Sequence, residues 1–225
     1  MQSLTMAALA AALLLAQAAL AAENLSPTTT RRARLLRDVP ASGAAGEKME
    51  STTYYPLAVG SSWEYKAGDA RYTMRVTKHE KVGDVLCARV EMFVRDKDKE
   101  KSVSYEHVAV TKDGVYRYSF ESKEAKPPVL FFKLPPKKDE TWKVDSKVGG
   151  EPIKGSFKNT GEADVKVAAG NYKAVTIASQ DLEANGVKMS VTYFFAEKVG
   201  MVKQIVEVAG QKIVIELEKY EPPKK

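Results

Sequence analysis

Hydrophobic and polar residues alternate along most of the chain from Tyr54 onward. In residues 86–94 and 187–195, an apolar side chain stands at nearly every second position. A period of two is typical of β-strands that bury one face, whereas no stretch keeps the 3.6-residue period of an amphipathic helix. The same alternation relates four shorter sets: Tyr72, Met74 and Val76; Tyr116, Tyr118 and Phe120; Val165 and Val167; and Ile213, Ile215 and Leu217. The pattern predicts an all-β protein with little helix in the mature chain.

Turn-forming residues separate these strand-like runs. Asn185-Gly186 is the clearest case, because both residues tolerate the positive φ angles of a two-residue hairpin turn. The other turn sequences are Val82-Gly83-Asp84, Asp113-Gly114, Gly170-Asn171 and Ala209-Gly210. Turns this short join antiparallel neighbours. We therefore predict an antiparallel, strongly curved sheet or a partly open barrel.

Two proline pairs interrupt the pattern in the middle of the chain. Pro127-Pro128 and Pro135-Pro136 bracket the sequence VLFFK. Proline has no N–H to donate, so it is excluded from central strands of a sheet. The sequence therefore predicts that residues 121–142 form a loop or an edge segment.

The stretch YFFAEKVGMVKQ, residues 193–204, combines three aromatic rings with a polar break at Glu197-Lys198. Gly200 follows this break, and glycine permits a bend or bulge that a residue with a Cβ resists. We interpret the stretch as a corner of the sheet whose aromatic rings form a core layer. The alternative is a platform on which a ligand stacks.

The first 22 residues are typical of a secretory signal peptide. Residues 6–16 are apolar, and Ala19-Leu20-Ala21 places small residues where a signal peptidase cleaves. The apolar run is too short to cross about 30 Å of hydrocarbon. The alternative is an Ala-rich helix of the mature protein, since residues 1–5 carry no Lys or Arg. We expect export to the periplasm or the extracellular space, with no transmembrane span in the mature chain.

Two further regions follow residues 1–22. Residues 23–53 are rich in Ser, Thr, Ala, Gly and Pro, and they predict a flexible tail. Its arginines could touch an anionic surface, or the tail could be a plain solvated linker. Residues 54–221 are predicted to form a single β domain.

The net charge limits the partners that we expect, and the cysteine content limits how the fold can be stabilised. The formal net charge is +6, which favours acidic partners such as lipid headgroups or anionic envelope polymers. Nucleic acid is not an expected partner of an exported chain. Cys87 is the single cysteine, so no internal disulfide can form and the core alone must stabilise the fold.

Three blocks resemble a broad family of exported bacterial proteins that includes TapB-like domains and domains of unknown function. The blocks are YYPLAVGSSWEY at 54–65, VAAGNYKAVTI at 167–177 and YFFAEKVGMVKQ at 193–204. Glu197-Lys198 departs from the family, which often has a short glycine-containing turn there. The resemblance implies a β-rich exported domain. It implies no established activity and no catalytic residue.

The sequence shows little sign of catalytic or metal chemistry. His79 and His107 stand far apart without a companion motif, whereas a transition-metal site needs three or four ligands. Arg89 follows Cys87 on the same strand face and could lower the pKa of the thiol, but a structural thiol is the better interpretation. Asp96, Asp98 and Glu100 alternate as Ca²⁺ ligands do, yet lysines interleave them and the glycine of a calcium loop is absent.

We predict a non-enzymatic binding module of the cell envelope that holds a lipid or another apolar ligand in its curved sheet. No cofactor and no metal are expected. The candidate lining residues, which could instead simply fill the core, are Tyr72, Met74, Tyr116, Tyr118, Phe131, Phe132 and Phe195. One alternative is a structural or adaptor protein that uses a sheet edge or its tail in an envelope assembly. A hydrolase of an envelope polymer is the third interpretation.

Overall fold

The computed structural model of this protein describes residues 49–96 and 99–224, so the predicted signal peptide and most of the predicted tail lie outside the described residues. Twelve β-strands follow one another in this part of the chain. They are β1 (Ser62–Ala67), β2 (Ala70–Val82), β3 (Val85–Asp96), β4 (Lys99–Thr111), β5 (Gly114–Phe120), β6 (Lys123–Lys133), β7 (Thr141–Val148), β8 (Glu151–Val167), β9 (Gly170–Ala184), β10 (Val187–Ala196), β11 (Gly200–Val208) and β12 (Gln211–Glu221).

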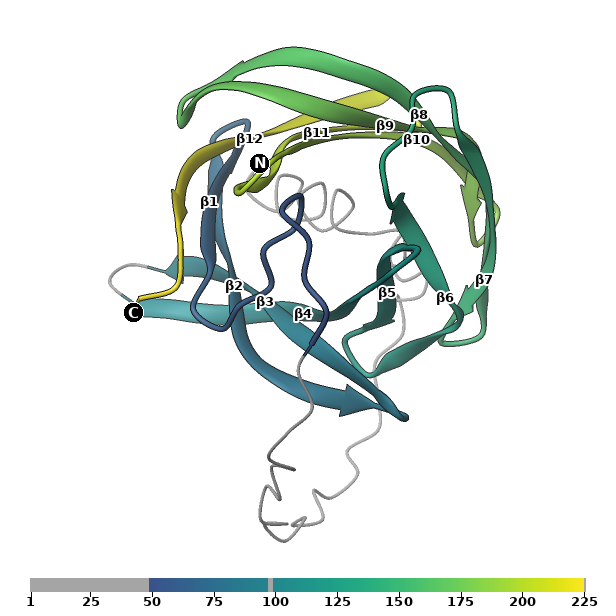
Figure 1. Ribbon diagram of the computed structural model, residues 1–225, viewed down its shortest axis with the longest axis horizontal. Coiled ribbons are helices and arrows are strands. Elements are labelled where there is room, and N and C mark those ends of the chain that lie inside the picture. Colours follow the sequence, from purple (N-terminus) through teal and green to yellow (C-terminus); the bar gives the residue numbers. More distant parts are fainter. Residues whose placement is uncertain (1–48, 97–98, 225) are drawn as a thin grey trace, which may run out of the picture.

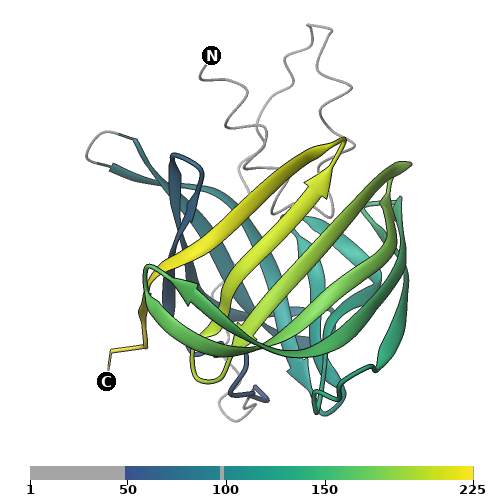
Figure 2. The same cartoon turned by 90° about the horizontal axis from the view of Figure 1, so that it is seen from above.

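The twelve strands close into an antiparallel barrel. Each strand pairs with its neighbours in the sequence, and β1 also pairs with β12, where Trp63 lies opposite Tyr220. Figure 1 shows the ring that the strands form, and Figure 2 shows their tilt in the wall. The prediction of an antiparallel all-β fold is confirmed, and the barrel is closed. Among the described residues, no helix has the length and apolar character needed to cross a bilayer.

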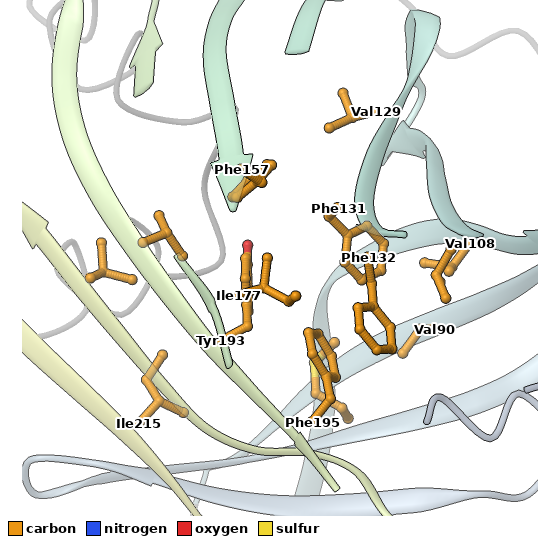
Figure 3. Packing of buried hydrophobic residues seen from close by; sticks show 14 of the residues in the cluster. Val90, Val108, Val129, Phe131, Phe132, Phe157, Ile177, Tyr193, Phe195 and Ile215 are labelled. Carbon is orange, nitrogen blue, oxygen red and sulfur yellow. The ribbon is translucent and has the colours of Figure 1, made fainter. Parts of the chain in front are cut away.

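The alternation of the sequence becomes an inside and an outside of the barrel. In β7, Trp142, Val144 and Val148 are buried, while Lys143 and Lys147 between them are exposed. Aromatic rings from other strands meet in the interior (Figure 3), where Phe132 stacks on Phe195 with 4.8 Å between ring centroids. Burial of this apolar surface drives the closure of the sheet.

The segment 121–142 differs from the prediction of a loop or edge. Most of it is strand, namely β6 and the start of β7, because the prolines sit where the β6–β7 ladder has already ended. That ladder has two residue pairs, and the second is Lys126 with Lys147. Side chains then replace ladder bonds: the Trp142 indole donates to the Leu130 carbonyl at 2.9 Å, and the Ser146 hydroxyl donates to the Pro127 carbonyl at 2.5 Å.

The segment that precedes β1 covers one end of the barrel. It crosses the middle of the ring in Figure 1 and lies at one end of the strands in Figure 2. Leu57 is buried, and its carbonyl lies 2.7 Å from Nε2 of His79. The Lys198 N–H donates to the Thr53 carbonyl at 2.6 Å. These contacts fix the segment against β2 and the β10–β11 turn.

The stretch 193–204 forms a hairpin at this same covered end. β10 ends at Ala196, Lys198 adopts a φ of 64°, and β11 begins at Gly200 with a φ of 96°. A Cβ at Gly200 would lie 3.4 Å from both Pro56 and Trp63, so glycine allows a close approach as well as the turn. The structure thus places a sheet corner here, with Phe195 buried in the core.

Candidate functional site

A cavity of about 50 Å³ lies inside the barrel, next to the segment that covers its end. Its wall is mostly apolar, with seven aromatic rings, three methionines and three valines, and three residues add amide or charged groups. The wall residues are Tyr55, Trp63, Tyr65, Tyr72, Phe131, Tyr193 and Phe195; Met74, Met189 and Met201; Val90, Val191 and Val206; and Glu106, Arg117 and Gln204. This composition is typical of small-molecule sites, which are apolar with a few placed polar groups.

An ion pair projects into this apolar cavity. Nε of Arg117 donates to Oε2 of Glu106 at 2.5 Å, and their side chains are 13% and 5% exposed. The Arg117 guanidinium also lies over the Phe131 ring, 5.4 Å from its centroid. Burial disfavours the charged guanidinium, but the Glu106 carboxylate outweighs burial, so the pKa of Arg117 is raised above its usual value. Arg117 therefore stays charged inside the barrel.

A β-bulge explains why Arg117 points inward. Glu106 pairs with Phe120, and His107 pairs with Ser119, but Val108 pairs with Arg117. Tyr118 is therefore an extra residue without a partner in β4, and the alternation of faces shifts by one position there. Arg117 shares the inner face with Val108 as a result.

Four tyrosines surround the ion pair. The Tyr65 hydroxyl donates to the Met201 carbonyl at 2.8 Å, while Tyr55, Tyr72 and Tyr193 complete the wall. Burial raises the pKa of all four hydroxyls above the usual tyrosine value. They stay neutral at physiological pH and offer hydroxyl groups, which can donate or accept hydrogen bonds.

The structure divides the seven predicted lining residues into three groups. Tyr72, Met74, Phe131 and Phe195 lie on the cavity wall. Phe132 is fully buried and packs against Phe195 and Tyr54 instead. Tyr116 and Tyr118 are half-buried and do not belong to the wall, because the bulge at Tyr118 breaks the alternation that grouped them with Phe120.

Sequence reasoning missed both members of the ion pair. A signal for Glu106 existed, because it stands in phase with Ser104, Val108 and Val110, all of which are buried. A carboxylate at an inward position of a half-buried strand is unusual enough to suggest a site. Arg117 had no such signal, since the bulge that turns it inward cannot be read from the alternation.

A second polar cluster lies on the outer face of the same strands. Nε2 of His107 lies 2.8 Å from Oε1 of Glu80, and Nδ1 lies 2.6 Å from Oγ of Ser119. Burial opposes the charge of Glu80, but hydrogen bonds from His107 and Lys78 outweigh it and lower the pKa of that carboxyl to about 2. Acid, histidine and serine are the components of a hydrolytic triad. However, Ser119 is 3% exposed and donates to the Glu121 carbonyl, so its oxygen is shielded from a substrate.

The remaining candidate groups are held by structural contacts. His79 and His107 face different partners, and the described residues contain no group of three or more metal-ligating side chains. Arg89 pairs with Glu91 and Glu80, and burial raises the pKa of the Cys87 thiol to about 11. The thiol therefore stays protonated, which agrees with the structural interpretation. Of the three alternating acidic residues 96, 98 and 100, Asp98 lies outside the described residues.

Comparison with known proteins identifies the fold. No family model and no curated protein matches this sequence, so the resemblance to TapB-like domains stays a prediction. Two solved structures are similar over their whole length. One is a candidate exported protein with a YmcC-like fold from Bacteroides fragilis, 11% identical, with a TM-score of 0.51 over 76% of this chain. The other is a candidate lipoprotein from Parabacteroides distasonis, 10% identical, with a TM-score of 0.45 over 77% of this chain.

Proposed function

We propose that this protein is an exported, non-enzymatic binding module that takes a small apolar or amphipathic ligand into its barrel. The observation that carries the proposal is the cavity into which Glu106 and Arg117 project. A buried ion pair contributes little net stability compared with apolar residues of similar size. A polar pair in an apolar cavity is therefore better explained by a ligand than by folding.

The size of the cavity limits the ligand. About 50 Å³ of space corresponds to roughly four water molecules. A long acyl chain does not fit this space as it stands. Met74, Met189 and Met201 are flexible side chains on the wall, and their rotation can enlarge the cavity for a ligand of moderate size.

Export rests on two supports. The first 22 residues have the composition of a signal peptide. In addition, the fold resembles that of a protein described as exported. We place the module in the periplasm or the extracellular space on these grounds.

The adaptor alternative has less support in the fold. Recruitment through a sheet edge needs an unpaired stretch of strand. Each of the twelve strands has a neighbour on both sides, and at the shortest ladder, between β6 and β7, the Trp142 and Ser146 side chains bond across the gap. The large hydrophobic residues exposed among the described residues are Val59 and Val103. Neither forms an extended apolar patch of the kind that marks many protein interfaces.

Calorimetry with linear alcohols from butan-1-ol to decan-1-ol tests the proposal. Affinity should rise by about 0.8 kcal/mol per methylene until the cavity is full, and then level off. Met189→Trp should abolish binding because indole occupies the cavity. Tyr118→Trp is the matched control. Because Tyr118 does not belong to the wall, this variant should bind the alcohols as the parent does. No binding by any alcohol, or equal binding by both variants, would show that the cavity is not the ligand site.

A further inference from the structure

The charges on the cavity wall bear on which ligands the barrel accepts, if the proposed function holds. Glu106 and Arg117 are the charged side chains among the sixteen wall residues. They form one ion pair, so the wall has no net charge. The remaining polar groups on the wall are the tyrosine hydroxyls, the Trp63 indole and the Gln204 amide.

The Arg117 guanidinium has donors beyond the one that Glu106 uses. A guanidinium carries five N–H groups in a planar fork. Its Nε–H is directed at Oε2 of Glu106. The Tyr193 and Tyr55 hydroxyls are further polar neighbours of Arg117, and Arg117 lowers the pKa of the Tyr193 hydroxyl, in part through a hydrogen bond, against the stronger effect of burial. The terminal N–H groups of Arg117 are thus in a position to donate to an oxygen atom inside the cavity.

A charged ligand would give the cavity a net charge. An anion bound to Arg117 would place a second negative charge beside Glu106, which is 5% exposed and cannot turn to water. A cation bound to Glu106 would place a second positive charge beside the buried Arg117. An uncompensated charge in a buried site is strongly unfavourable. A neutral group with an acceptor oxygen can accept a hydrogen bond from the guanidinium without this cost.

We infer that the barrel selects a neutral ligand with a hydrogen-bond acceptor, such as an amide or an ester carbonyl, on a short apolar body. Arg117 donates to that oxygen. Glu106 holds the guanidinium in place and excludes carboxylates and phosphates by its charge. Glu106 is therefore the residue that determines ligand charge.

The test compares hexanamide, hexanoate and hexylammonium at pH 7 by calorimetry, with hexan-1-ol as a reference for binding as such. The full exported chain should bind hexanamide about tenfold or more tightly than either ion. Glu106→Gln should reverse the preference between hexanamide and hexanoate, because Arg117 then carries the only charge on the wall. Glu218→Gln, which breaks the exposed pair with Arg71, is the matched control and should leave the order unchanged.

Each outcome separates this inference from the proposed function. If neither hexan-1-ol nor any other probe binds, the proposed function fails and the inference falls with it. If hexan-1-ol binds but hexanoate or hexylammonium binds as tightly as hexanamide, the cavity is a ligand site and the inference about charge is wrong. The comparison of probes on the unmodified protein decides this even if Glu106→Gln does not fold.

Discussion

The two faces of the β4–β5 pair carry polar clusters of opposite character. Glu106 and Arg117 point into the barrel, and His107 and Ser119, their near neighbours in the same strands, point outward. Both ring nitrogens of His107 have a partner among the described residues. The Nε–H of Arg117 is directed at Glu106, and the guanidinium borders the cavity. The outer cluster is explained by contacts within the wall, whereas the inner pair is the basis of the proposed ligand site.

The largest expected effect comes from breaking the inner pair. Arg117→Met should destabilise the protein by about 3–5 kcal/mol, because Glu106 is left buried without its partner. Adding Glu106→Leu should recover most of the loss, since apolar residues of similar size replace a buried pair at little cost. Urea denaturation of both variants measures the two values. If Arg117→Met alone were as stable as the parent, water would have to reach Glu106 freely. Arg71→Met, in an exposed pair, is the control and should cost under about 1 kcal/mol.

A smaller effect is expected from the outer cluster. His107→Phe should destabilise the protein by about 2 kcal/mol, since the buried Ser119 hydroxyl and Glu80 both lose a partner. Affinity for hexanamide should stay within about twofold of the parent if this cluster only stabilises the wall. Denaturation and calorimetry on the same sample give both numbers. Loss of binding at unchanged stability would assign the ligand to the outer face.

The smallest effect concerns acid stability. Glu80 has a folded-state pKa of about 2, below its ordinary value of 4.5, so its stabilising contribution is complete above pH 4.5 and is lost as pH falls toward 2. Its side chain is 31% exposed, and solvent screening reduces the contribution to about 1 kcal/mol. Glu80→Gln should therefore lower stability at pH 6 by about this amount and have no effect near pH 2. An equal effect at both pH values would contradict the lowered pKa.

The sequence allowed the strands and several turns to be predicted because they depend on local properties. The alternation in β10 marks its buried face, and Asn185 and Gly186 adopt the positive φ angles of 48° and 76° that a tight hairpin turn requires. Closure of the barrel depends on pairing between β1 and β12, the first and last strands, which no local pattern encodes.

The candidate site was predictable only in part. Tyr72 and Phe195 stand at inward positions of regular alternation and do lie on the cavity wall. Tyr116 and Tyr118 do not belong to the cavity wall, because one extra residue in β5 changes which face its neighbours occupy. The same bulge places Arg117 inside. A bulge depends on how two strands pair, so the inward position of Arg117 could not be predicted from the alternation within one strand.

A crystal structure of the protein with hexanamide bound would show which groups of the barrel contact the ligand. We predict that the carbonyl oxygen of hexanamide lies about 3 Å from a terminal nitrogen of Arg117, with its alkyl chain among Met74, Met189 and Phe195. Glu106 should keep its contact with Nε of the same guanidinium. Hexanamide found at the His107 cluster, or a cavity that holds only water at saturating hexanamide, would contradict the account.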